Sequence, residues 1–128
     1  MSAQVQEVSH YLPACTIPVA AGDGIGPEIM EATLSILRAA DSSLHFEPVT
    51  VGLQAYNSGL LSGIGEDTWA AIKKHGVILK GPITTPQGGG YKSVNVTLRK
   101  TLGLYANLRP CTSFAPYVTS MHKKMDVV

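Results

Sequence analysis

The sequence is poor in charged, aromatic and cysteine residues, and it has no long apolar run. Only 15% of its 128 residues are charged and 45% are hydrophobic, which excludes the composition of a disordered chain. No stretch approaches the roughly 20 apolar residues that a membrane span needs. The N-terminus has neither a basic segment followed by an apolar one nor an excess of arginine, so no signal or transit peptide is expected. We expect a globular cytoplasmic protein without a membrane partner.

Two cysteines, Cys15 and Cys111, lie far apart and have no Cys-x-x-Cys or Cys/His spacing around them. We expect reduced thiols and no zinc site. Charge is unevenly distributed: residues 65–128 hold nine Lys and Arg against three acidic residues, whereas residues 1–64 hold one Arg against six. A basic half hints at an anionic ligand, although solvated surface gives the same pattern. No nucleic-acid partner is expected.

Strand-like and helix-like segments alternate from residue 16 onward. Strands are expected at residues 16–21, 45–52, 77–79 and 104–108, and helices at residues 27–40, 66–75 and 94–102, with a loop or short helix at 54–65. Pro27 suits the first turn of its helix, and Gly76 suits a C-cap. Pro18 argues against a central position for the first strand. The alternation predicts an α/β fold with crossover connections.

One apolar stripe is expected along the first helix, formed by Ile29, Thr33, Ile36, Leu37 and Ala40. Residues 1–15 show no period and are expected to form a flexible tail before a domain over residues 16–128. Residues 125–128 are typical of the start of a buried strand, at which the sequence stops. We therefore expect the domain to be truncated at its C-terminal end.

A glycine-rich turn, residues 22–26 (GDGIG), joins the first strand to the first helix. The dinucleotide fingerprint Gly-x-Gly-x-x-Gly would bind a pyrophosphate here, but the spacing is Gly-x-Gly-x-Gly and Pro27 lacks an N–H. Asp41 stands about where a ribose-binding acid is expected, yet it equally fits a polar helix end. A tight turn that starts a helix is the favoured interpretation, and a Rossmann site is the alternative.

A second candidate site spans residues 80–109. Ser93 precedes a helical pattern and can cap it, and Asn95 and Arg99 are four apart, so they share a helix face. Lys80 and Arg109 adjoin strand-like runs, at whose ends α/β folds bind ligands. A helix N-terminus with these neighbours suits a carboxylate or a phosphate. Spacing alone leaves an anion site and plain surface charge equally open.

Four motifs, in order along the chain, resemble the N-terminal portion of the isocitrate and isopropylmalate dehydrogenase family. They are residues 22–28 (GDGIGPE), 81–86 (GPITTP), 93–100 (SVNVTLRK) and 105–110 (YANLRP). The resemblance runs from about residue 16 to the last residue. It implies the N-terminal part of that family's α/β fold, which is distinct from the Rossmann fold, with residues 22–26 as a structural turn.

The resemblance also implies roles for individual side chains. Substrate carboxylates would be bound by Ser93, Asn95, Arg99 and Arg109. Thr84 would contact the nicotinamide cofactor, with Lys80 and Thr85 near the active site. Isopropylmalate dehydrogenases carry an apolar residue at the position of Asn95, so the polar pair favours isocitrate. In some relatives the serine matching Ser93 is a phosphorylation switch; whether it is one here stays open.

The expected function is oxidative decarboxylation of isocitrate to 2-oxoglutarate with NADP, a step of the tricarboxylic acid cycle, by a homodimeric full-length enzyme. This chain would be a fragment that is inactive alone. NAD stays possible, although residues 84–90 resemble NADP-using bacterial enzymes. The Mg²⁺ or Mn²⁺ ligands and the catalytic acid and base are expected outside this chain, where Asp126 is the only acidic residue after Arg109. Alternatives are isopropylmalate or homoisocitrate oxidation and a non-catalytic anion-binding or assembly module.

Overall fold

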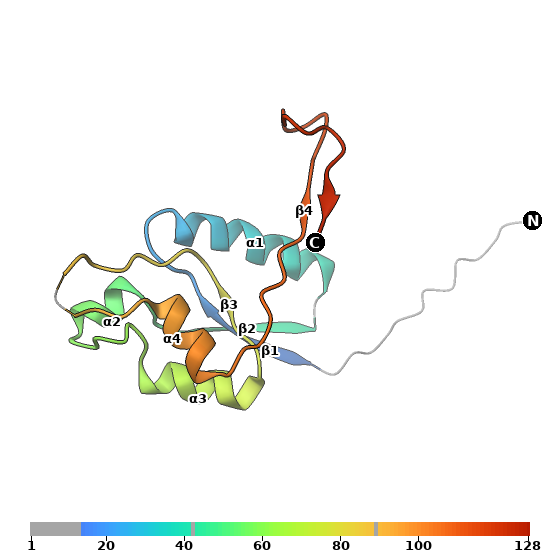
Figure 1. Ribbon diagram of the computed structural model, residues 1–128. Coiled ribbons are helices and arrows are strands. Elements are labelled where there is room, and N and C mark those ends of the chain that lie inside the picture. The colour runs from blue at the N-terminus through green and yellow to red at the C-terminus, as the bar shows by residue number, and fades with distance from the viewer. Residues whose placement is uncertain (1–13, 42, 89) are drawn as a thin grey trace, which may run out of the picture. The chain divides into compact units, whose positions relative to one another are not determined.

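The computed structural model describes residues 14–41, 43–88 and 90–128, and it divides the chain after residue 98 into two compact units (Figure 1). The expected tail lies largely outside the described residues. The first unit is built on three parallel strands, β1 Cys15–Ala20, β2 Leu44–Pro48 and β3 Leu79–Lys80. Their order is β2-β1-β3. The parallel sheet confirms the predicted α/β class.

Four helices accompany these strands in the described part of the chain: α1 Gly26–Ala40, α2 Leu53–Asn57, α3 Glu66–His75 and α4 Val94–Thr101. The chain passes through α1 from β1 to β2, and through α2 and α3 from β2 to β3. Because β2 and β3 flank β1, right-handed crossovers put α1 and α3 on opposite faces of the sheet, as Figure 1 shows. None of the described helices is long and apolar enough to cross a membrane.

The central strand is β1, so the expectation that Pro18 excludes this position was wrong. On the β3 side, Ala20 accepts a hydrogen bond from the Gly81 N–H at 2.8 Å, and on the β2 side Val19 accepts one from Val49 at 2.8 Å. Successive residues face alternate neighbours, so the nitrogen of Pro18 faces the β3 side. The β1–β3 pairing begins only at Val19. The missing N–H therefore costs no ladder hydrogen bond.

Helix α1 packs by a different face from the expected stripe. Met30 is buried, whereas Ile29 and Ile36 are 47% and 70% exposed. Met30 and Leu34 instead line a pocket of about 370 Å³ together with β1 and β2 side chains, among them Phe46. The prediction was wrong because helical periodicity detects an apolar stripe without showing which stripe the sheet contacts.

Several element boundaries agree with the sequence and others shift. Helix α3 has the expected bounds, and Gly76 ends it in the left-handed conformation with φ 70°, as predicted for a C-cap. Strand β2 ends at Pro48, four residues before the expected end. Strand β3 is displaced from residues 77–79 to Leu79–Lys80. Residues 53–57 form the short helix that was one of two expectations for their segment.

The second unit, residues 99–128, contains one antiparallel pair, β4 Cys111–Thr112 with β5 Asp126–Val127. The strand expected at residues 104–108 does not form, because no strand among residues 99–128 pairs with that segment to complete its hydrogen bonds. A strand near the C-terminus is confirmed at β5, but both of its residues are exposed rather than buried. Cys15 and Cys111 are both free and exposed.

Candidate functional site

The glycine-rich turn packs against the loop that follows β3. The Asp23 N–H donates to the Pro82 carbonyl at 2.7 Å. Gly22 has φ 86°, and a Cβ there would clash with the same Pro82 oxygen. A Cβ at Gly81 would in turn clash with the Ala21 carbonyl. These glycines therefore allow two stretches of the chain's own backbone to touch, which supports the interpretation of residues 22–26 as a structural turn.

The Asp23 side chain extends this contact to two further segments. One carboxylate oxygen, Oδ2, accepts a hydrogen bond from the Thr84 N–H at 2.8 Å. Both oxygens lie within reach of the Leu53 N–H at the start of α2, Oδ1 at 3.1 Å and Oδ2 at 3.3 Å. No role for Asp23 is predicted from the sequence. The available signal was an acidic residue in the first strand-to-helix turn, where parallel strands end together.

Lys80 lies at the carboxyl end of β3, and Thr84 and Thr85 lie in the loop that follows. Lys80 is the last residue of the strand, and its Nζ donates to the Gly81 carbonyl at 2.9 Å. The Thr84 residue is exposed and Thr85 is half-buried. Ligands of open α/β sheets bind outside this edge. The loop therefore presents Thr84 where a ligand could reach it.

Ser93 and Asn95 lie at the start of α4, as the spacing predicted. The Ser93 carbonyl accepts the Thr97 N–H at 2.9 Å, which is the first backbone bond of a helix from its N-cap residue. Both Ser93 and Asn95 are half-buried, and Val94 between them is fully buried. The buried side chain anchors the first turn, and the two polar residues flank it.

The segment that leads into α4 is held by Tyr56, another residue without a role in the sequence analysis. Tyr56 belongs to α2 and is buried. Its hydroxyl donates to the Lys92 carbonyl at 2.6 Å, and its ring packs edge-on against Tyr91. The Lys92 N–H donates to the Leu61 carbonyl at 3.0 Å. These contacts determine where the chain enters the helix just before Ser93.

Arg99 and Arg109 belong to the second unit. Arg99 lies in the last turn of α4, the helix that also carries Asn95, and Arg109 lies in the irregular segment before β4. Both are exposed, and neither forms an ion pair with an acidic residue among the described parts of the chain. The structure thus places Lys80 at the end of β3, the two threonines in the loop after it, and Ser93 and Asn95 at the start of α4. That both arginines join them in one site stays a prediction.

Asp41 lies at the C-terminal end of α1. It is the C-cap residue, and its carboxylate accepts the Ser43 hydroxyl at 2.7 Å and the Ser43 N–H at 2.8 Å. The hydroxyl first, and the N–H second, lower the pKa of Asp41 below its ordinary value. This geometry fits the polar helix end rather than a ribose-binding acid.

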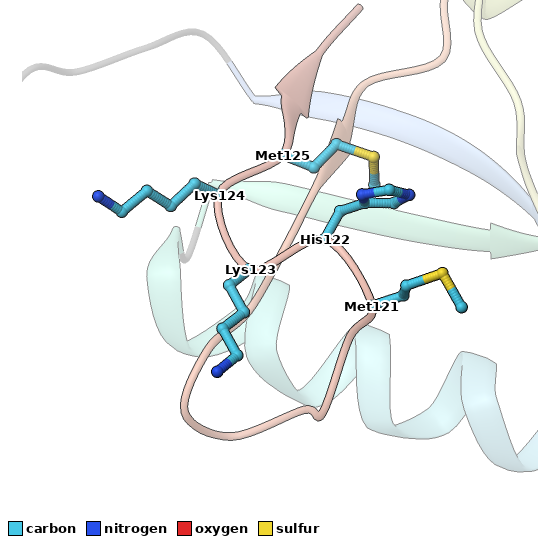
Figure 2. Close-up of a pocket in the computed structure, with 5 residues that line it drawn as sticks. All are labelled: Met121, His122, Lys123, Lys124 and Met125. Atoms are coloured by element: carbon cyan, nitrogen blue, oxygen red, sulfur yellow. The ribbon is translucent and has the colours of Figure 1, made fainter.

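Another hollow, of about 750 Å³, lies on the loop before β5 in the second unit and is lined by Met121, His122, Lys123, Lys124 and Met125. Figure 2 shows the two lysine side chains extending away from the His122 ring. Five consecutive residues of one surface loop form this hollow. Among residues 14–41, 43–88 and 90–128, no three His, Cys, Asp or Glu side chains come together so as to hold a metal ion.

Comparison with known proteins identifies the family. The model of the isocitrate/isopropylmalate dehydrogenase family matches residues 16–128. The chain belongs to this family. Its members are dehydrogenases, a class of oxidoreductases, and the resemblance carried by the four motifs is confirmed.

Individual relatives are similar to this chain in sequence and in structure. An isocitrate dehydrogenase (NADP) of Rickettsia felis is 54% identical over 111 residues, which cover 87% of this chain and 23% of that protein. Subunit 2 of the mitochondrial isocitrate dehydrogenase (NAD) of Schizosaccharomyces pombe is 43% identical, with coverages of 81% and 27%. The crystal structure of isocitrate dehydrogenase from Methylococcus capsulatus superposes with TM-score 0.80 at 36% identity, covering 88% of this chain and 33% of that one. The chain spans about a quarter of the length of these curated relatives.

Proposed function

We propose that this chain forms the N-terminal part of an NADP-dependent isocitrate dehydrogenase, which oxidises isocitrate and releases CO₂ to give 2-oxoglutarate. The observation that carries the proposal is the pair Ser93 and Asn95 at the start of α4, both half-buried and both polar. An isopropyl group beside them would leave their hydrogen-bonding groups unpaired, whereas a carboxylate would pair with them.

The substrate is a tricarboxylate, and the proposed site matches its charge. The N-terminal end of α4 carries the positive end of the helix dipole and unpaired backbone N–H groups. The Ser93 hydroxyl and the Asn95 amide add neutral donors. Arg99 and Arg109 would each clamp one carboxylate through two parallel hydrogen bonds, which gives both affinity and orientation.

The Thr84 hydroxyl is proposed to contact the nicotinamide of NADP, which accepts a hydride from C2 of isocitrate. Thr84 suits this role because it is exposed at the carboxyl end of β3 and its backbone is held by Asp23. NAD is the alternative cofactor, since the Schizosaccharomyces pombe relative is named for NAD and the Rickettsia felis relative for NADP.

We propose that the whole enzyme binds a divalent metal, with ligands that lie outside the described residues of this chain. Those residues bring no three His, Cys, Asp or Glu side chains together, and the exposed Asp126 carboxylate accepts a hydrogen bond from the Thr112 hydroxyl at 3.4 Å. They do not fit Mg²⁺ or Mn²⁺, so we assign them no step through the metal. We propose that other parts of a cytoplasmic homodimer, acting in the tricarboxylic acid cycle, supply the ligands and the catalytic acid and base.

Replacement of Asn95 tests the substrate assignment in the whole enzyme. Asn95→Leu is expected to lower kcat/KM for isocitrate by about 10- to 100-fold and to improve the relative rate with isopropylmalate. Val96→Leu, at the exposed next position of α4, is the matched control and should leave the preference unchanged. An unmodified enzyme that oxidises isopropylmalate or homoisocitrate but not isocitrate would overturn the assignment.

The 128-residue chain alone offers a second test. With isocitrate, Mg²⁺ and NADP it is expected to show no turnover, because the proposed metal ligands lie outside it. Turnover by this chain would contradict that part of the proposal. Isocitrate binding without dehydrogenase activity, in the longest natural form of the protein, would instead favour an anion-binding module.

A further inference from the structure

One residue of the glycine-rich turn, Asp23, forms hydrogen bonds with two residues of the loop that follows β3. Through its backbone, Asp23 donates to the Pro82 carbonyl at 2.7 Å, and through its side chain it accepts from the Thr84 N–H at 2.8 Å. The two contacts fall two residues apart on the same short loop. The same carboxylate accepts the Leu53 N–H, so it also joins this loop to the start of α2.

The absence of a side chain at Gly52 leaves room for the Asp23 carboxylate. A Cβ added at Gly52, which has φ 82°, would lie 2.5 Å from Asp23 Oδ2 and 3.0 Å from Ile83 Cγ2. The carboxylate of half-buried Asp23 thus lies directly against the backbone at Gly52 and the loop at Thr84.

We propose that Asp23 is a positioning residue, which sets the backbone at Thr84 and thereby the place of the Thr84 side chain for the nicotinamide cofactor. This role rests on the proposed function, in which Thr84 contacts NADP. Asp23 needs no contact with substrate or cofactor, because it acts through two backbone N–H groups. A carboxylate can accept both N–H groups. An amide of the same shape has only one acceptor oxygen, and its NH₂ group would face the other backbone N–H, donor against donor.

Kinetics of the whole enzyme give the first test. Asp23→Asn is expected to raise the KM for NADP by about tenfold and to lower kcat, because small displacements of a positioning group have effects of this size or larger. The KM for isocitrate should change less than about twofold. Asp41→Asn is the matched control, since its carboxylate also accepts a backbone N–H, that of Ser43, but at the end of α1. An unchanged KM for NADP in Asp23→Asn would overturn the proposal.

Hydrogen exchange of the 128-residue chain gives a readout that needs no activity. In Asp23→Asn, the amides of Thr84 and Leu53 should exchange faster, while the Gly76 amide, bonded to Ile72 at 2.8 Å, should not. Unchanged exchange at Thr84 would overturn the proposal. Faster exchange at Thr84, combined with no NADP-dependent activity of the unmodified enzyme, would leave the backbone clamp intact and refute the proposed function instead.

A pair of glycine variants displaces the carboxylate without removing it. Gly52→Ala should reproduce the rise in KM for NADP, because the new methyl group meets Asp23 Oδ2. Gly59→Ala introduces comparable backbone strain, at φ 88°, but meets nothing within 4 Å. It should leave the KM for NADP unchanged. Equal values for the two variants would show that backbone strain, and not the Asp23 contact, governs the effect.

Discussion

Replacement of Tyr56 by phenylalanine removes a single hydroxyl from the contact between α2 and the segment that enters α4. Tyr56 is only 3% exposed, and its hydroxyl donates to the Lys92 carbonyl at 2.6 Å. The ring lies edge-on to Tyr91, with centroids 5.1 Å apart and planes at 74°. Phenylalanine retains this aromatic contact, so the substitution isolates the hydrogen bond.

The expected magnitude follows from the surroundings of that bond. A neutral hydrogen bond contributes about 1 kcal/mol net to stability, and an acceptor left buried and unpaired costs more. Lys92 is an exposed residue, so water can replace part of the lost contact. We therefore expect Tyr56→Phe to lower the free energy of unfolding of the 128-residue chain by about 1 kcal/mol, measured by urea denaturation with linear extrapolation.

The matched control is Tyr117→Phe, because Tyr117 is 91% exposed. Its free energy of unfolding should stay within about 0.5 kcal/mol of the original. Equal stability of the two variants would refute the assignment of Tyr56 as an anchor of the α4 entry. In the whole enzyme, Tyr56→Phe should raise the KM for isocitrate more than the KM for NADP, because Lys92 directly precedes Ser93.

Three further predictions concern other parts of the chain. In the whole enzyme, Arg99→Lys should raise the KM for isocitrate about tenfold, because lysine lacks the bidentate fork; an unchanged KM would identify Arg99 as surface charge. Ser43→Ala should raise the pKa of Asp41 toward its ordinary value in an NMR titration, and no change would refute the hydrogen bonds as the cause. Because the folded-state pKa is lowered, this contact stabilises the fold above the unfolded-state pKa and is lost as the pH falls through the folded-state value. Gly26→Ala should lower the Tm despite the helix propensity of alanine, because its Cβ would lie 2.5 Å from the Ala21 carbonyl oxygen; a higher Tm would show that the clash relaxes.

Elements with strong local signals are predictable from the sequence. Helix α3 begins with two acidic residues and ends at Gly76, and the structure has the predicted bounds. The start of α4 after Ser93 is likewise predicted by the local sequence, because a serine that suits an N-cap precedes apolar residues spaced by four. These signals act within one or two turns of a helix, so no tertiary contact is needed to interpret them.

Predictions that depended on a distant partner were less successful. The segment 104–108 is apolar enough for a strand but has no neighbouring strand in the second unit, and a strand requires one. The apolar stripe of α1 was assigned to the wrong face, because the position of the sheet decides which face is buried. The prediction for Pro18 was wrong for the same reason. Whether a proline fits in this central strand depends on where the pairing of β1 with β3 begins.

The sequence by itself determined the family and the α/β class, whereas the residues that the motifs assign to substrate and cofactor stay predictions. The family and the class follow from residue type and order, which local chemistry and motif spacing preserve. Only the tertiary structure decided that the glycine-rich turn holds the chain's own loop, and that Asp23 joins that loop to α2. The physical reason is that the Asp23 hydrogen bonds span 30 and 61 residues of sequence. Contacts at such separation exist only after the strand ends have been brought to one edge of the sheet.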